Sequence, residues 1–116
     1  MIYTVTLNPA LDCFVRPDEF LPGGVCRYDS ARFLPGGKGV NVSLLLKSLG
    51  AETVAAGITA GFTGRELTAL LGRAGCPADF MELHKGLTRV NIKILPKGRP
   101  ETCLLYTSPS PRDVEE

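Results

Sequence analysis

The stretch FLPGGKGVNVSLLLKSLG, residues 33–50, decides the fold, because it joins a glycine-rich turn directly to a helix. Asn41 suits an N-cap or a first-turn position, and the three consecutive leucines that follow favour helix. Gly50 is typical of the residue just after a helix end. The pattern therefore predicts a helix from Val40 to Leu49. Apolar residues cover most of its circumference, so we expect this helix to be buried.

Segments on both sides of this helix alternate between strand and helix patterns. Residues 63–75 predict an amphipathic helix with Leu67, Leu70 and Leu71 facing inward and Gly75 closing it. Strands are predicted at residues 2–7, 25–33, 52–59, 78–84 and 88–95. Such alternation indicates an α/β fold with a largely parallel sheet.

Residues 12–24 are the exception to this regular alternation. They contain Pro17 and Pro22, and proline cannot donate a hydrogen bond to a neighbouring strand. We therefore expect short edge strands or loops here, not a central strand.

Composition excludes several classes of function. The formal net charge is +1, so there is no electrostatic argument for a nucleic-acid or membrane partner. The N-terminus lacks a basic segment followed by a long apolar run, so it does not resemble a secretory signal. Four cysteines without a CxxC pair, beside a single histidine, predict neither a zinc site nor a disulfide framework. We expect reduced thiols and a cytoplasmic location.

Two common phosphate-binding motifs do not fit the glycine-rich turn. A Walker A loop requires Ser or Thr after its lysine, and Lys38 is followed by Gly39. A dinucleotide fingerprint requires a third glycine three residues after its second, and that position holds Val42.

Another set of motifs does fit. TLNPALD (residues 6–12), PGGKGVNVSLLLKSLG (residues 35–50) and GLTRVNIKI (residues 86–94) occur together in this order. They resemble the PfkB (ribokinase-like) carbohydrate kinases, most closely the 1-phosphofructokinase and tagatose-6-phosphate kinase branch. The resemblance covers about residues 1–102, and we interpret that range as the N-terminal portion of a ribokinase-like three-layer α/β sandwich with a small β lid.

The resemblance implies a function. Members of this branch use ATP and Mg²⁺ to phosphorylate a ketohexose monophosphate, here fructose 1-phosphate to fructose 1,6-bisphosphate, with tagatose 6-phosphate as the alternative substrate. It also implies a homodimer formed through the β lid. A different interpretation is a non-catalytic chain that binds a phosphosugar or self-associates.

The same resemblance assigns the substrate-binding residues at the glycine-rich turn. Asp12 would accept hydrogen bonds from sugar hydroxyls, although an Asp that only shapes the Asn-Pro turn is the simpler interpretation of its position. Around the turn, the backbone would approach the ligand and a lysine would bind its phosphate. The residues concerned are Gly36, Gly37, Lys38, Gly39 and Asn41. The alternative is a tight turn that leads into a buried helix.

The predicted strand at residues 88–95 places three polar side chains on one face. Arg89, Asn91 and Lys93 alternate with apolar residues, which fits either a solvent-exposed face or the underside of a lid. The resemblance favours the lid, with Arg89 on the substrate phosphate and Asn91 on the substrate. Arg27, on another predicted lid strand, would reach a substrate across a dimer interface.

The family's catalytic aspartate lies in a Gly-Ala-Gly-Asp type motif, which also forms the anion hole beside the nucleotide site. No such motif occurs in the sequence, so we assign no catalytic residue here. Residues 103–116, beginning CLLYTSPSPRD, do not resemble the family and predict an artefactual or disordered tail. We therefore expect a truncated kinase that holds the substrate-binding half only, is inactive alone and is marginally stable.

Overall fold

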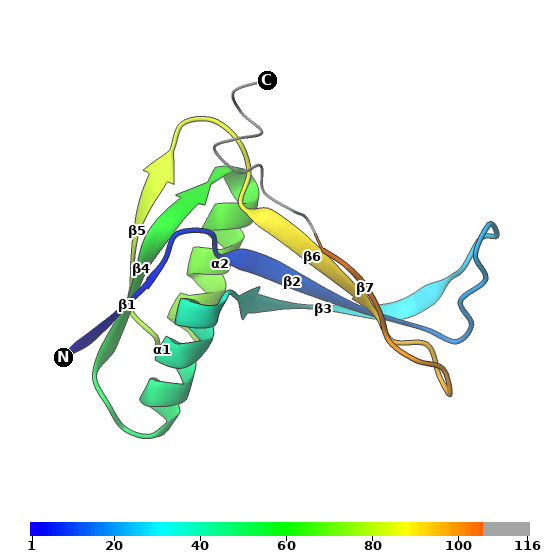
Figure 1. Ribbon diagram of the computed structural model, residues 1–116, viewed down its shortest axis with the longest axis horizontal. Helices are drawn as coiled ribbons and strands as arrows, with labels where there is room; N and C mark the ends of the chain where they lie inside the picture. Colours follow the sequence, from blue (N-terminus) through cyan, green and yellow to red (C-terminus); the bar gives the residue numbers. More distant parts are fainter. Residues whose placement is uncertain (106–116) are drawn as a thin grey trace.

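The computed structural model describes residues 1–105 and has two parts, an α/β core and a β lid that projects from it (Figure 1). The radius of gyration is 16.0 Å. A compact domain of this length has a radius of gyration of about 13 Å, so the lid extends well beyond the core.

The core is a three-stranded parallel sheet with two helices. Its strands are β1 (Ile2–Thr6), β4 (Thr53–Ala60) and β5 (Ala78–Leu83), in the order β1-β4-β5. Helix α1 (Lys38–Ser48) packs on β1 and β4, and α2 (Gly61–Arg73) packs on β4 and β5. This arrangement confirms the predicted α/β class.

One face of this sheet carries the hydrophobic core. Five side chains form its buried cluster, namely Val40, Ala55, Leu67, Leu71 and Cys76. Beneath α1, buried hydroxyls replace apolar contacts: Ser43 Oγ lies 2.6 Å from Thr4 Oγ1 and 2.8 Å from Thr53 Oγ1. The hydrophobic core is therefore small, and it depends mostly on α2.

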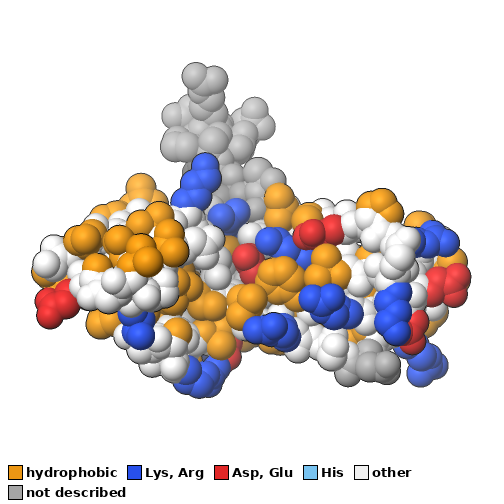
Figure 2. Space-filling view, turned by 90° about the horizontal axis from the view of Figure 1, so that it is seen from below, with side chains coloured by type: hydrophobic (Ala, Val, Ile, Leu, Met, Phe, Trp, Pro, Cys, Tyr) orange, Lys and Arg blue, Asp and Glu red, His pale blue; other side chains and the backbone are white. Residues whose placement is uncertain are grey.

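The opposite face of the sheet is open. Apolar side chains on it are exposed, including Tyr3, Val5, Met81 and Leu83, and we call these four residues the open face. Figure 2 shows hydrophobic side chains gathered over the core, at left, and Lys and Arg side chains spread along the lid, at right. Within residues 1–105, neither helix has the length and apolar content needed to cross a membrane.

The lid is a four-stranded sheet in the order β3-β2-β6-β7. Its strands are β2 (Ala10–Pro17), β3 (Tyr28–Gly36), β6 (Arg89–Ile94) and β7 (Thr102–Leu104). β2 pairs antiparallel with β3 and parallel with β6, so it is a central strand. The prediction of edge strands or loops was therefore wrong for residues 12–17, whereas residues 18–24 form a loop as expected. Pro17 is tolerated because it ends β2, where the register with β3 shifts after Val15.

Helix α1 also differs from its prediction in two respects. It begins at Lys38, and its N-cap is Gly37, so Asn41 lies in the first turn and does not cap the helix. The helix is not buried all round, since Leu45 on its outer side is exposed. Its predicted end is confirmed, because Gly50 follows the C-cap with φ +86°.

The expected boundary at residue 102 coincides with the start of β7. Ile94 pairs with Thr102 and Ile92 with Leu104, so residues 102–104 complete the lid sheet. The rest of the expected tail, residues 106–116, lies outside the described residues.

Candidate functional site

Apart from Arg27, the expected site residues lie at or beside the carboxyl edge of the core sheet, where the lid begins. β1 ends at Thr6 and β4 at Ala60, and both helices start at this edge, at Lys38 and Gly61. In open α/β sheets, ligands bind outside the carboxyl ends of the strands. A cleft of about 150 Å³ lies here, lined by residues that include Leu7, Asn8, Pro9, Thr59, Ala60 and Thr88.

Two expected site residues meet directly across β2 and β6. Asp12 and Asn91 are register partners, and Asn91 Nδ2 donates a hydrogen bond to Asp12 Oδ1 over 3.1 Å. Asn91 is only 7% exposed, which rules out a solvent-exposed strand face at this position. The side chains on this face of the lid, which we call its polar face, also include Lys93, whose Nζ lies 5.0 Å from the centre of the Phe14 ring.

A different feature of the chain itself explains why each of the three positions in the turn is glycine. A Cβ on Gly36 would lie 2.7 Å from the carboxylate of Asp12. Gly37 has φ +108°, a conformation that other residues rarely adopt. A Cβ on Gly39 would collide with Thr6 Oγ1 and lie 3.0 Å from the Val5 carbonyl oxygen, so glycine lets α1 dock on β1. Packing explains Gly36 and Gly39, and backbone conformation explains Gly37, so all three positions have a reason that involves no ligand.

Three polar side chains around the turn are available to a ligand. Lys38 and Asn41 are exposed at the start of α1, and among the side chains that the structure describes no carboxylate lies within ion-pair distance of Lys38. Arg89, at the start of β6, is half-buried, and its buried Nε has no hydrogen-bond partner among the described residues. The amide groups at the start of α1 add a favourable environment for an anion.

Arg27 is not brought to this site within one chain. It is exposed and lies just before β3, whose first residue, Tyr28, pairs with Pro17 at the far end of the hairpin. Gly36, at the other end of β3, is eight residues from Tyr28, which corresponds to about 26 Å of strand. A role for Arg27 at a substrate would require a second copy of the chain.

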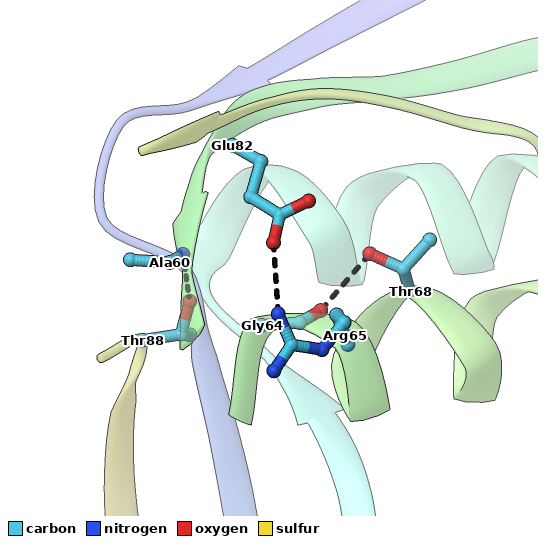
Figure 3. A network of polar contacts seen from close by, with 6 residues as sticks. All are labelled: Ala60, Gly64, Arg65, Thr68, Glu82 and Thr88. Carbon is cyan, nitrogen blue, oxygen red and sulfur yellow. Dashed lines mark hydrogen bonds and ion pairs between the residues drawn. The ribbon is translucent and has the colours of Figure 1, made fainter. Parts of the chain in front are cut away.

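Sequence reasoning missed a set of polar contacts that joins the lid to the core, and Figure 3 shows the contact between Thr88 and Ala60. Thr88 N–H donates to the Ala60 carbonyl over 2.9 Å, and Thr88 Oγ1 accepts from Ala60 N–H at 3.0 Å. Thr63 Oγ1, near the start of α2, donates to the Thr88 carbonyl over 2.7 Å. A Cβ on Gly64 would lie 2.8 Å from Thr88 Oγ1, so close packing here requires glycine. Only the Thr-Arg-x-Asn motif, which begins at Thr88, gave a signal for this residue.

We expect Thr88→Val to reduce the free energy of unfolding by about 1–3 kcal/mol, because it leaves the buried Ala60 N–H without an acceptor. Urea unfolding followed by circular dichroism measures the change. Thr68→Val is the matched control, since the Thr68 hydroxyl donates to Gly64 O on the exposed side of α2. Equal losses for the two variants would contradict the role given to Thr88.

The thiols and the acidic residues do not form a group that could hold a metal ion in the described part of the chain. All four cysteines are unpaired. Burial raises the pKa of the Cys13 and Cys76 thiols, and the hydrogen bond to Glu101 raises that of Cys103, so these three are poor nucleophiles at neutral pH. Residues 1–105 contain no group of three or more His, Cys, Asp or Glu side chains placed to hold a metal ion.

Comparison with known proteins shows which proteins this chain is similar to. The D-tagatose-1-phosphate kinase of Bacillus licheniformis is 47% identical over 94 residues, and the 1-phosphofructokinase of Bacillus subtilis is 44% identical over 94 residues. Each match covers 81% of this chain and 31% of the relative, so the chain spans about a third of their length. The crystal structure of Escherichia coli phosphofructokinase-2 in complex with fructose-6-phosphate matches 98% of this chain and 38% of its own, with TM-score 0.85 and 28% identity.

The structural match confirms the expected ribokinase-like fold. A family model described as pfkB family carbohydrate kinase matches residues 7–114, which include most of the expected tail. This chain therefore belongs to the pfkB family of carbohydrate kinases.

Proposed function

We propose that this chain provides the sugar-phosphate site of an ATP-dependent kinase that phosphorylates a ketohexose monophosphate. The observation that carries the proposal is the pairing of Asp12 with Asn91 beside the start of α1, where Lys38 has no ion-pair partner in the described chain. A phosphorylated sugar needs an acceptor for its hydroxyl groups next to a cation that binds its phosphate, and Asp12 and Lys38 are groups of these two kinds. Family membership supplies the reaction type.

The proposed roles follow from the chemistry of each group. The Asp12 carboxylate accepts hydrogen bonds from sugar hydroxyls and fixes the orientation of the ring. Lys38 and the amides of Gly37 and Gly39 bind the phosphate that the substrate already carries. Arg89 adds a second cation for that phosphate, and Asn41 donates its amide to the sugar.

Fructose 1-phosphate is the substrate that we favour. The two relatives described above are named for kinases of fructose 1-phosphate and tagatose 1-phosphate, while the phosphofructokinase-2 crystal holds fructose-6-phosphate. Tagatose 6-phosphate, the other substrate implied by the motifs, is therefore a useful competitor. Binding of fructose 1-phosphate in preference to sugar 6-phosphates, measured by calorimetric competition, would support the assignment.

ATP and Mg²⁺ enter this proposal through the family alone. Residues 1–105 do not supply a metal-binding set of side chains, so we derive no step through Mg²⁺. We place the catalytic aspartate and the nucleotide site in the part of the family pattern that this chain does not match. Sequencing the source gene past the codon for Thr102 tests this placement, and an ATP-dependent kinase assay on the encoded protein tests the activity. A reading frame without a Gly-Ala-Gly-Asp motif would contradict the placement.

A homodimer formed through the lid is part of the same proposal. The lid face opposite Asp12 is apolar, and it forms a groove of about 390 Å³ lined by residues that include Cys13, Val15, Ile92, Ile94 and Leu104. Pairing two such faces would remove this apolar surface from water. In this proposal the dimer also brings Arg27 to a partner's site. We also propose a cytoplasmic location, which the four unpaired cysteines favour.

Substitution of Lys38 tests the binding site directly. We expect Lys38→Ala to weaken binding of fructose 1-phosphate at least tenfold, because a charge-assisted hydrogen bond contributes about 1.5–3 kcal/mol. Isothermal titration calorimetry at two salt concentrations measures the loss. Lys47→Ala is the matched control, since Lys47 is exposed in the last turn of the same helix. A binding constant that is unchanged by Lys38→Ala would remove Lys38 from the site.

The second candidate function is binding without turnover, with self-association through the lid. The exposed apolar groove of the lid favours it. It predicts that the source protein binds fructose 1-phosphate and loses affinity with Lys38→Ala, yet releases no ADP from ATP in its presence. Phosphorylation of the sugar would exclude this second function.

A further inference from the structure

The carboxylate of Asp12 is enclosed by two neighbouring strands of the lid. On one side, Asn91 of β6 donates its hydrogen bond to Oδ1. On the other side is Gly36, the last residue of β3, where an added Cβ would lie 2.7 Å from Cγ and both carboxylate oxygens. The sequence alone suggested that Gly36 and Asn91 contact the ligand, whereas the structure places both against Asp12.

The amide of Asn91 is placed to hydrogen-bond another side chain of the protein and not a ligand. Its Oδ1 is buried without a hydrogen-bond partner in the described chain, so a bound ligand has little access to it. Its Nδ2 is used by Asp12. Burying an amide whose oxygen has no hydrogen-bond donor costs free energy. At this position the hydrogen bond to the Asp12 carboxylate is the interaction that offsets this cost.

Gly36 provides the space that the carboxylate occupies. Its φ is not in the left-handed region, so the backbone at this position would accept alanine. The atoms that a new methyl group would meet all belong to the end of the Asp12 side chain. An alanine at position 36 would therefore displace the carboxylate and leave the strand intact.

We propose that Asn91 and Gly36 are positioning residues that hold the Asp12 carboxylate in the orientation that receives the sugar hydroxyls. Neither is a ligand contact in this proposal, and both act through Asp12. The inference rests on the proposed function, because it assumes that Asp12 binds the sugar.

A double-mutant cycle tests the proposal in the full 116-residue chain. Calorimetry would measure the affinity for D-fructose 1-phosphate in the wild type and in Asn91→Leu, Gly36→Ala and Asp12→Ala, and then in each of the first two combined with Asp12→Ala. Inorganic phosphate serves as a second probe that has no hydroxyl for Asp12 to orient. Val54→Ala, in the core strand β4 and outside the lid, is the control variant.

We expect Asn91→Leu and Gly36→Ala each to weaken fructose 1-phosphate binding about tenfold, and to have no effect once Asp12 is alanine. Affinity for inorganic phosphate should stay at the wild-type value in both. A purely structural role would lower the affinity for both probes alike. The Val54→Ala control should leave both affinities unchanged.

Three results would overturn the proposal. The first is a loss on Asn91→Leu or Gly36→Ala that persists in the Asp12→Ala background, since it would mean that these residues act independently of Asp12. The second is an equal loss of phosphate affinity. The third is wild-type affinity in Gly36→Ala, which decides the matter even where Asn91→Leu fails to fold. Absence of fructose 1-phosphate binding by the folded wild type would instead refute the proposed function, and this inference with it.

Discussion

Replacement of Leu67 by alanine should destabilise the chain by about 2–5 kcal/mol, the usual cost of deleting a buried leucine side chain. Leu67 is 0% exposed and packs in the buried cluster with Val40, Ala55, Leu71 and Cys76. Leu67 and Leu71 are the two leucines of that cluster, so the substitution removes a large part of its packing. We expect the variant to be substantially unfolded at 25 °C where the wild type is folded.

Leu45→Ala provides the matched control for this prediction. Leu45 is on α1 and is 60% exposed, so the same substitution removes little buried surface. Urea unfolding of both variants, followed by circular dichroism, compares the two losses. If Leu45→Ala cost as much as Leu67→Ala, the core would lie elsewhere than the structure places it.

The local pattern of the sequence was sufficient to predict the core elements. The two helices end where a glycine with positive φ follows, at Gly50 and Gly75, and both ends were visible from residue type. Leu67 and Leu71 were correctly predicted to face inward from their spacing. Helix ends and inward-facing positions depend on residues that are close together in the chain, so they can be predicted from one sequence.

The arrangement of the lid was not predictable from local pattern. β2 becomes a central strand because β6, which begins 72 residues after the end of β2, pairs with it. Two prolines nearby favoured an edge position, and nothing local indicates that Pro17 ends the strand at a register shift. Pairing between distant strands is a tertiary property, and it outweighed the local signal.

The residues of the candidate site could be predicted from the sequence, but most of the contacts between them could not. The motifs identified Asp12, Lys38 and Asn91, but only the register of β2 with β6 places Asn91 on Asp12. The glycines of the turn were attributed to ligand approach, and the structure shows that packing against Asp12 and Thr6 explains two of them. Thr88 was missed as a lid anchor because its partner, Ala60, lies on another strand.

The open face of the core sheet should make the isolated chain self-associate. Tyr3, Val5, Met81 and Leu83 are exposed on it, and Val5 and Met81 are each 66% exposed. β1 and β5 are the outer strands of this sheet in the described chain, so each also presents an edge with free backbone groups. Apolar surface next to open edges favours association in water.

We expect size-exclusion chromatography with light scattering to show oligomers at micromolar concentration, together with strong binding of an apolar fluorescent dye. Val5→Lys combined with Met81→Lys should shift the chain toward monomer and reduce dye binding, because a lysine on this face opposes its burial. Ala69→Lys combined with Gly72→Lys is the control, since it adds the same charge on the exposed side of α2.

Equal shifts by both pairs would assign the effect to net charge, and a monodisperse wild-type monomer without dye binding would contradict the prediction. Association that survives both pairs would instead arise at the lid, whose apolar groove neither pair alters.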